Sequence, residues 1–151
     1  MTIRVTPMLS QLMSDEGFRA SPYKCTANVW TIGYGSTSWQ GRRVTEDTPP
    51  ITHQAAITEL KANVLDCMEE ATQLYSTFDS YPPRLQEILV MLVFQLGKTR
   101  LKKFVNMNKA IRAMNLRGWA NELKDSLVYR QATNRIERYL TTIRSDPSYT
   151  W

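Results

Sequence analysis

The sequence has one histidine, two cysteines and no long apolar run, and each scarcity excludes a class of protein. His53 has no histidine, cysteine or carboxylate at ligand spacing, so we expect a surface residue where a helix begins and no metal ion or cofactor. With a single histidine and no nucleophile elbow, a Ser-His-Asp triad is excluded. Two cysteines do not make a disulfide framework. The apolar run at residues 88–94 is too short to span a bilayer, which takes about 20 residues.

Signals for nucleotide binding and for export are also missing. The Gly33-Tyr34-Gly35 segment lacks the third glycine and the following helix of a dinucleotide loop, and no Gly-Lys-Ser/Thr signature occurs. No apolar segment precedes Asp15 and Glu16, so a secretory signal is not expected. We therefore expect a protein that is made and folded in the cytoplasm.

Charge divides unevenly along the 151 residues. Residues 82–151 hold 13 Lys/Arg against 5 Asp/Glu, whereas residues 1–81 hold 6 against 9, within an overall net charge of +5. A basic second half is typical of a surface that meets a polyanion, such as nucleic acid, a membrane surface or an anionic cell-wall polymer. A solvated helical surface explains the charge equally well. The length and the 42% hydrophobic content fit one globular domain.

The pattern of apolar residues predicts a mixed α+β fold. Residues 6–17 have helical spacing, and residues 23–40 carry aromatic, β-branched and turn-forming residues typical of two or three short antiparallel strands. A polar connection is expected at 41–50. The remaining predicted elements are helices: 52–75 with Thr52 as a possible N-cap, 84–96 inside the core with Gly97 as its stop, and three shorter ones at 104–114, 118–129 and 133–144.

Glu16 is the strongest candidate for chemistry. It lies at a predicted helix end beside Gly17, and an aromatic-rich strand segment with Tyr23, Trp30 and Tyr34 follows it. An apolar setting of this kind raises the pKa of a carboxyl group and keeps it protonated for general acid catalysis. Taken by itself, however, a solvated surface glutamate is the commoner explanation.

A longer motif around Glu16 favours the catalytic explanation over the solvated surface residue. Glu16, Cys25 and Thr31 are separated by eight and then five residues, and a Thr-Ile-Gly-x-Gly strand ends at Gly35. This register resembles the phage lysozymes of the T-even type, glycoside hydrolase family 24, whose signature has Asp or Cys at the middle position. The segments 93–99, 131–135 and 141–144 also resemble that family, so the likeness covers almost the whole chain.

The resemblance implies a single lysozyme-like domain over residues 1–151, with a small N-terminal antiparallel β lobe and a larger helical lobe joined by the long helix. It implies an endolysin that hydrolyses the β-1,4 bond between N-acetylmuramic acid and N-acetylglucosamine in peptidoglycan. Glu16 would protonate the leaving oxygen, Cys25 would take the place of the second catalytic group and Thr31 would hold the attacking water. By the same resemblance, we expect the cleft to be lined by Gly35, Phe94, Gln95, Gly97 and Arg135. Arg135 would pair with the catalytic acid.

Cys25 is the unusual member, because glycosidases commonly use two carboxyl groups. A thiol with an ordinary pKa near 8.5 is mostly neutral at pH 7 and becomes useful as a thiolate only if that pKa is lowered. It could also be a small residue tolerated at a strand turn. Ser36 is a further departure, since the family often has histidine there. The four tryptophans, Trp30, Trp39, Trp119 and Trp151, are expected to be core or edge aromatics rather than sugar platforms.

Two other functions remain open on sequence. A lytic transglycosylase needs only one catalytic acid, so the thiol at Cys25 is compatible with it. A non-catalytic wall-binding module would use the basic helices, although Glu16 and Thr31 argue against a decayed site. Nucleic-acid binding is not expected, because no helix-turn-helix accompanies the positive charge. The resemblance further implies a monomer that stays in the host cytoplasm until a holin gives it access to the wall.

Overall fold

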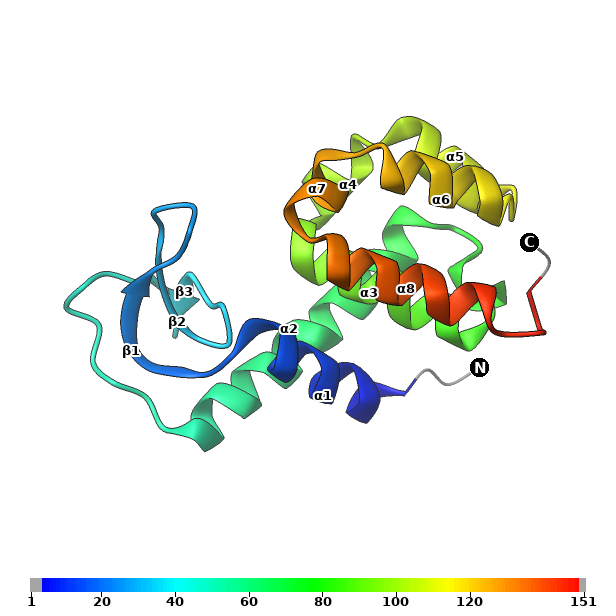
Figure 1. The fold of residues 1–151 in the computed structure, drawn as a ribbon. Coiled ribbons are helices and arrows are strands. Elements are labelled where there is room, and N and C mark those ends of the chain that lie inside the picture. Colours follow the sequence, from blue (N-terminus) through cyan, green and yellow to red (C-terminus); the bar gives the residue numbers. More distant parts are fainter. Residues whose placement is uncertain (1–3, 150–151) are drawn as a thin grey trace. The chain divides into compact units, whose positions relative to one another are not determined.

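The computed structural model describes residues 4–149, which form eight α-helices, one short 3₁₀ helix and four short strands. This part of the chain divides into two compact units. We call residues 5–65 the N-terminal unit, and residue 4 together with residues 66–149 the C-terminal unit. The elements of the N-terminal unit are α1 (Val5–Glu16), β1 (Arg19–Lys24), β2 (Trp30–Gly33), β3 (Ser38–Trp39), β4 (Arg42–Arg43) and the first half of α2 (His53–Leu74) (Figure 1).

Helix α1 forms where the sequence predicts it. Met8 and Leu12, four residues apart, are buried and give the helix its apolar face. The helix stops at Gly17, which has a φ of 70° and donates its backbone N–H to the carbonyl of Met13 at 3.0 Å. Glycine adopts this left-handed conformation at little cost, so the chain leaves the helix directly after Glu16.

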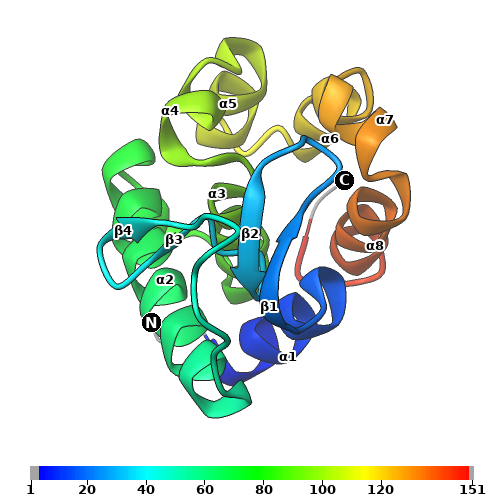
Figure 2. The ribbon, with the colours of Figure 1, turned by 90° about the vertical axis from the view of Figure 1, so that its left-hand side faces the viewer.

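Two small antiparallel sheets follow α1. Strands β1 and β2 lie side by side (Figure 2), with Tyr23 opposite Thr31, and an irregularity interrupts the register between Arg19 and Tyr23. Strands β3 and β4 are joined by a two-residue turn in which Gln40 and Gly41 have φ angles of 50° and 77°. Such a turn matches the twist of a tight hairpin. The connection predicted at 41–50 therefore contains a strand, because the positive φ angles of Gln40 and Gly41 let the chain reverse within two residues.

Helix α2 begins as expected. The Oγ1 atom of Thr52 accepts a hydrogen bond from the backbone N–H of Ala55 at 3.1 Å, which satisfies one free donor of the first turn. The preceding residue, Ile51, donates its backbone N–H to the carbonyl of Ala20 in β1 at 2.9 Å. This bond holds the start of α2 against the first sheet. The boundary between the two units falls inside α2.

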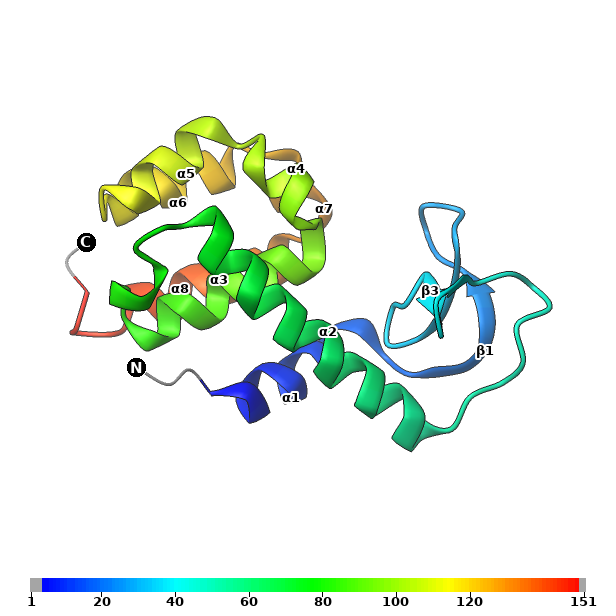
Figure 3. The same cartoon turned by 180° about the vertical axis from the view of Figure 1, so that it is seen from behind.

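The C-terminal unit is built around α3 (Pro83–Leu96), in which residues 85–93 are all buried. Figures 1 and 3 show α3 among the other helices of this unit, and α8 packs directly against it. This confirms the prediction of a helix that is apolar around nearly its full circumference. The other elements are the second half of α2, the 3₁₀ helix Phe78–Ser80, α4 (Lys98–Lys102), α5 (Val105–Arg112), α6 (Leu116–Lys124), α7 (Leu127–Gln131) and α8 (Thr133–Arg144).

The structure differs from the sequence prediction at two places in this unit. The short helix α4 was not predicted, since only Leu101 is buried in it and a single apolar residue gives no periodic signal. The predicted helix at 118–129 is two helices, because Ser126 has an extended ψ of 158° and its hydroxyl accepts the N–H of Tyr129 at 3.3 Å. This is an N-cap, and it starts a new helix.

The mixed α+β fold expected from the sequence is confirmed, with two small N-terminal sheets followed by a helical bulk. Trp119 is completely buried in the helical core, whereas Trp30 and Trp39 are half-buried on strands. Trp151 lies outside the described residues. Within residues 4–149, no helix is long and apolar enough to cross a membrane.

Candidate active site

Glu16 is the last residue of α1 and is half-buried. Its carboxylate lies against Gly35, because a methyl group placed on that glycine would come within 3.1 Å of the Glu16 Oε2 atom. Gly35 has a φ of 78°, which side-chain-bearing residues rarely adopt. The absence of a side chain at Gly35 therefore both permits the turn after β2 and leaves room for the catalytic candidate.

An aromatic cluster supports the segment that meets Glu16. The hydroxyl group of Tyr34 shares a hydrogen bond with the Nε2 atom of His53, and Tyr34 is buried. Phe18 completes the cluster, with its ring centroid 5.6 Å from that of Tyr34 and 4.8 Å from that of His53. His53 is exposed at the start of α2, as expected, but it also links α2 to the turn that holds Gly35.

Cys25 and Thr31 lie together at the closed end of the β1–β2 hairpin. The backbone N–H of Cys25 donates to the carbonyl of Val29 at 3.0 Å, and Asn28, with a φ of 62°, donates to the carbonyl of Cys25 at 2.8 Å. Thr31 is 3% exposed, and its hydroxyl donates to the same Val29 carbonyl at 2.9 Å. The turn thus places a thiol and a buried hydroxyl side by side.

The surroundings of Cys25 favour its thiolate. Hydrogen bonds from the backbone at Val29 and Ala27, and a smaller contribution from the Thr31 hydroxyl, lower the pKa of Cys25. Each donor stabilises the negative sulfur more than the neutral thiol. The thiol of Cys25 can act as a thiolate near neutral pH only if its pKa is lowered, and the surroundings change the pKa in that direction. Cys67 is the opposite case, because burial raises the pKa of its thiol to about 12.

Tyr23 belongs to the same site, although the sequence indicated it only as part of an apolar setting. Burial raises the pKa of its phenol, and the negative charges of Glu16 and Cys25 raise it further, while Arg19 opposes them. Arg19 places its guanidinium carbon 4.5 Å from the centroid of the Tyr23 ring. Tyr23 therefore lies within electrostatic reach of both catalytic candidates. Its position opposite Thr31 in the sheet was the available signal, but it required the strand register.

The other four predicted cleft residues belong to the C-terminal unit. Phe94 and Gln95 are half-buried in the last turn of α3, and Gly97 caps that helix with a φ of 81°. The Gln95 Oε1 atom is buried and accepts no hydrogen bond from the described residues. Arg135 is half-buried in the first turn of α8. The role of these residues in a cleft stays a prediction.

Glu16, Cys25 and Thr31 are residue types that acid–base catalysis can use. In the part of the chain that the structure describes, no group of three histidine, cysteine or carboxylate side chains is arranged to hold a metal ion. Cys25 and Cys67 are both free thiols. A carboxyl group, a thiol with a lowered pKa and a buried threonine hydroxyl offer a proton donor, a proton acceptor and a polar anchor for water.

Comparison with known proteins identifies the family. The family model for phage lysozyme matches residues 13–143, a range that contains every predicted site residue. The chain belongs to the phage lysozyme family. The resemblance deduced from the Glu16, Cys25 and Thr31 spacing is thereby confirmed, while the roles of the individual residues stay predictions.

The chain is similar to the SAR-endolysin of Haemophilus phage HP1 (strain HP1c1). The two sequences are 26% identical over 104 residues, which cover 69% of this chain and 53% of the relative. The chain therefore spans about half the length of the curated relative that it matches.

The contact between Gly35 and Glu16 gives a prediction with a matched control. If Glu16 is the catalytic acid, Gly35→Ala should lower turnover about tenfold, because its methyl group displaces the Glu16 carboxylate and small misplacements in active sites are costly. Gly41 has nearly the same φ, 77°, and a methyl group placed on it would meet nothing within 4 Å. Gly41→Ala should therefore lose a similar stability, about 1 kcal/mol, at unchanged turnover. Equal turnover in the two variants would show that the contact between Gly35 and Glu16 does not affect activity.

The two thiols should react very differently with iodoacetamide. Because the pKa of Cys25 is lowered, its thiolate fraction at neutral pH exceeds that of an ordinary cysteine, and the reaction should slow only as the pH falls through that lowered value. Cys67 should stay unmodified in the folded protein until the pH approaches about 12. Mass analysis of proteolytic fragments across a pH series measures both. Faster labelling of Cys67 than of Cys25 would contradict the assignment.

Proposed function

We propose that this chain is an endolysin, a lysozyme that hydrolyses the β-1,4 bond between N-acetylmuramic acid and N-acetylglucosamine in bacterial peptidoglycan. Membership of the phage lysozyme family supports the general activity. The observation that supports acid catalysis is the half-buried Glu16 carboxylate against Gly35, within the same unit as the Cys25 and Thr31 pair, and the bond that is cleaved is proposed from the family resemblance.

In the proposed reaction Glu16 acts as the general acid. It gives its proton to the glycosidic oxygen as the bond from that oxygen to the anomeric carbon breaks, and positive charge develops on the sugar ring. A water molecule then adds its oxygen to the anomeric carbon. The proton that this water loses passes to the Cys25 thiolate and returns through solvent to Glu16, so the enzyme is regenerated.

Thr31 and Tyr23 have supporting roles in this proposal. The Thr31 hydroxyl oxygen can accept a hydrogen bond from the attacking water, and its one proton is donated either to the Val29 carbonyl or to Cys25. Tyr23 lies in the electrostatic field of Glu16 and Cys25, so its phenol can donate to substrate or to water between them. Phe94, Gln95, Gly97 and Arg135 are proposed to contact the glycan, by family resemblance alone.

A lytic transglycosylase would use Glu16 in the same way but would let the sugar's own hydroxyl close an anhydro ring. The lowered pKa of Cys25 favours hydrolysis, because a thiolate offers the base that an attacking water needs and that ring closure by the sugar does not require. Access to the wall is proposed to follow release from the host cytoplasm with the help of a holin, and the enzyme is proposed to act as a monomer.

Digestion of purified peptidoglycan followed by mass analysis tests the proposal. We expect soluble fragments whose mass includes one added water for each bond cleaved. Fragments lighter by that water would establish transglycosylation. A protein that sediments with the wall and releases no fragments would be a binding module, and the proposed function would be wrong.

A further inference from the structure

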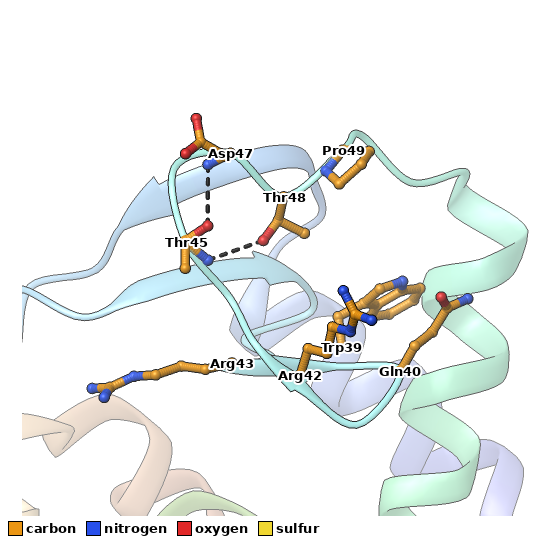
Figure 4. A pocket seen from close by; sticks show the side chains of 8 residues that line it. All are labelled: Trp39, Gln40, Arg42, Arg43, Thr45, Asp47, Thr48 and Pro49. Carbon is orange, nitrogen blue, oxygen red and sulfur yellow. Dashed lines mark hydrogen bonds between the residues drawn. The ribbon is translucent and has the colours of Figure 1, made fainter.

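A pocket in the N-terminal unit lies outside the proposed catalytic residues. Its volume is about 610 Å³, and it is bordered by the β3–β4 hairpin and the loop that follows it (Figure 4). None of Glu16, Cys25 and Thr31 lines it. The lining residues are Trp39, Gln40, Arg42, Arg43, Thr45, Asp47, Thr48 and Pro49.

The hairpin brings an aromatic ring and a guanidinium group together. Trp39 and Arg42 are directly opposite each other in the β3–β4 pair, so their side chains leave the same face of the hairpin. Figure 4 shows the Arg42 side chain beside the Trp39 ring, with Gln40 on the same side and Arg43 directed away from them. The tight turn at Gln40 and Gly41 fixes this pairing.

The opposite border of the pocket is held in shape by its own hydrogen bonds. The backbone N–H of Thr45 donates to the Thr48 hydroxyl at 2.9 Å, and the N–H of Asp47 donates to the Thr45 hydroxyl at 3.2 Å, as drawn in Figure 4. Pro49 limits the backbone further. A loop that is already ordered loses little conformational freedom when a ligand binds.

The charges that line the pocket are mixed. Arg42 directs its guanidinium group to the Trp39 side, Arg43 directs its own away from that side, and Asp47 supplies one carboxylate. Among residues 4–149, neither arginine side chain has a hydrogen bond, ion pair or ring contact, so the Arg42 guanidinium group is available to a ligand beside Trp39. Trp39 is half-buried and offers an apolar face. A ligand that fits carries carboxylates, has a small apolar group and tolerates one opposing carboxylate.

We propose that this pocket binds the carboxylate-bearing stem peptide of peptidoglycan, an inference that rests on the proposed function. Guanidinium groups form paired hydrogen bonds with carboxylates, which a stem peptide carries along its length. The Trp39 ring can cover its alanine side chains, and Asp47 can receive the amino group of its diamino acid. A polymer of phosphates fits less well, because it carries no amino group to pair with Asp47, whose carboxylate repels it. A volume of about 610 Å³ suits a short peptide.

The binding test uses the free tripeptide L-alanyl-γ-D-glutamyl-diaminopimelate, without any sugar, and follows the indole N–H signal of Trp39 by NMR. We expect saturable shifts at Trp39 and Gln40 that disappear when the carboxylates of the tripeptide are esterified. Arg42→Gln should weaken binding about tenfold, the loss typical of one charge-assisted hydrogen bond. Arg117→Gln, an exposed change of equal charge in the C-terminal unit, should leave it unchanged.

Two results of the titration would overturn the proposal. Equal shifts with the esterified tripeptide would show that the carboxylates are not recognised, and stronger shifts with glycerol phosphate would assign the pocket to a phosphate polymer. The dispersion of the NMR spectrum shows in the same experiment whether Arg42→Gln is folded.

A kinetic comparison separates this inference from the proposed function. On peptide-bearing wall, Arg42→Gln should raise KM about fivefold to tenfold with little change in kcat, whereas on glycan stripped of its peptides it should match the wild type. Equal loss on both substrates would refute a peptide site. If the wild type cleaves neither substrate, the proposed function fails, and the tripeptide titration still decides whether the pocket binds the peptide.

Discussion

Glu16→Gln should lower the rate of peptidoglycan cleavage about a thousandfold, within the range that general acid catalysis contributes. Glutamine keeps the size of the side chain and its contact with Gly35, but it has no proton to give to the leaving oxygen. The loss should appear in kcat rather than in binding, so the variant should still sediment with purified wall. The clearing of a wall suspension and the sedimentation of the protein measure the two effects.

Asp15→Asn is the matched control for this variant. Asp15 is the neighbouring carboxylate of α1, is also half-buried and accepts a hydrogen bond from Gln11 at 3.1 Å. Its removal changes the net charge by the same amount as Glu16→Gln. It should leave the cleavage rate within about twofold, because the amide oxygen of asparagine can still accept the hydrogen bond from Gln11. A similar loss in both variants would mean that charge near the end of α1, rather than proton donation by Glu16, sustains activity.

Cys25→Ser should lower cleavage about a hundredfold, at the lower end of the contribution of a general base. Serine keeps a small polar side chain at the turn but does not ionise near neutral pH, so the stabilising donors around position 25 have no thiolate to act on. Since Cys25 is a half-buried turn residue, the folded state should be retained. Product release against time, with a thermal unfolding curve, measures activity and folding separately.

Two further variants make the Cys25 prediction specific. Cys25→Asp should recover much of the activity, because a carboxylate at this position supplies the negative charge and the proton acceptor. Cys67→Ala removes the buried thiol and should leave cleavage unchanged. Near wild-type turnover in Cys25→Ser would remove Cys25 from the mechanism and leave the water to Thr31 and backbone groups.

Elements with many periodic apolar residues were predicted well from the sequence, whereas elements that depend on a single residue were not. The long helix from Thr52 and the buried helix before Gly97 repeat their apolar residues over several turns, so both were predicted within one or two residues. Helix α4 has one buried residue, and the break at Ser126 depends on one hydroxyl. Single residues of this kind are decided by tertiary contacts that a periodic pattern does not contain.

The candidate site was likewise predicted where the sequence spacing was informative, and its contacts between separate elements were not predicted. Glu16, Cys25 and Thr31 were predicted from their spacing, which is a property of the sequence, and their roles stay predictions. The proximity of Tyr23 to the charges of Glu16 and Cys25 depends on strand register, and the bond between Tyr34 and His53 joins elements that lie 19 residues apart. Most of the pocket beside Trp39 is formed by the segment predicted as a polar connection. The sequence pattern did not indicate the two-residue turn that pairs β3 with β4 there.

If Glu16 is the acid that drives hydrolysis at N-acetylmuramic acid, each cleavage leaves a new reducing end on that sugar, and this end can be measured. Purified peptidoglycan is digested with the wild type and with Glu16→Gln, the fragments are reduced with borohydride, and the reduced sugars are identified by mass. We expect reduced muramic acid ends from the wild type and almost none from Glu16→Gln. Reduced glucosamine ends, anhydro ends that resist borohydride, or equal yields from both proteins would contradict this expectation.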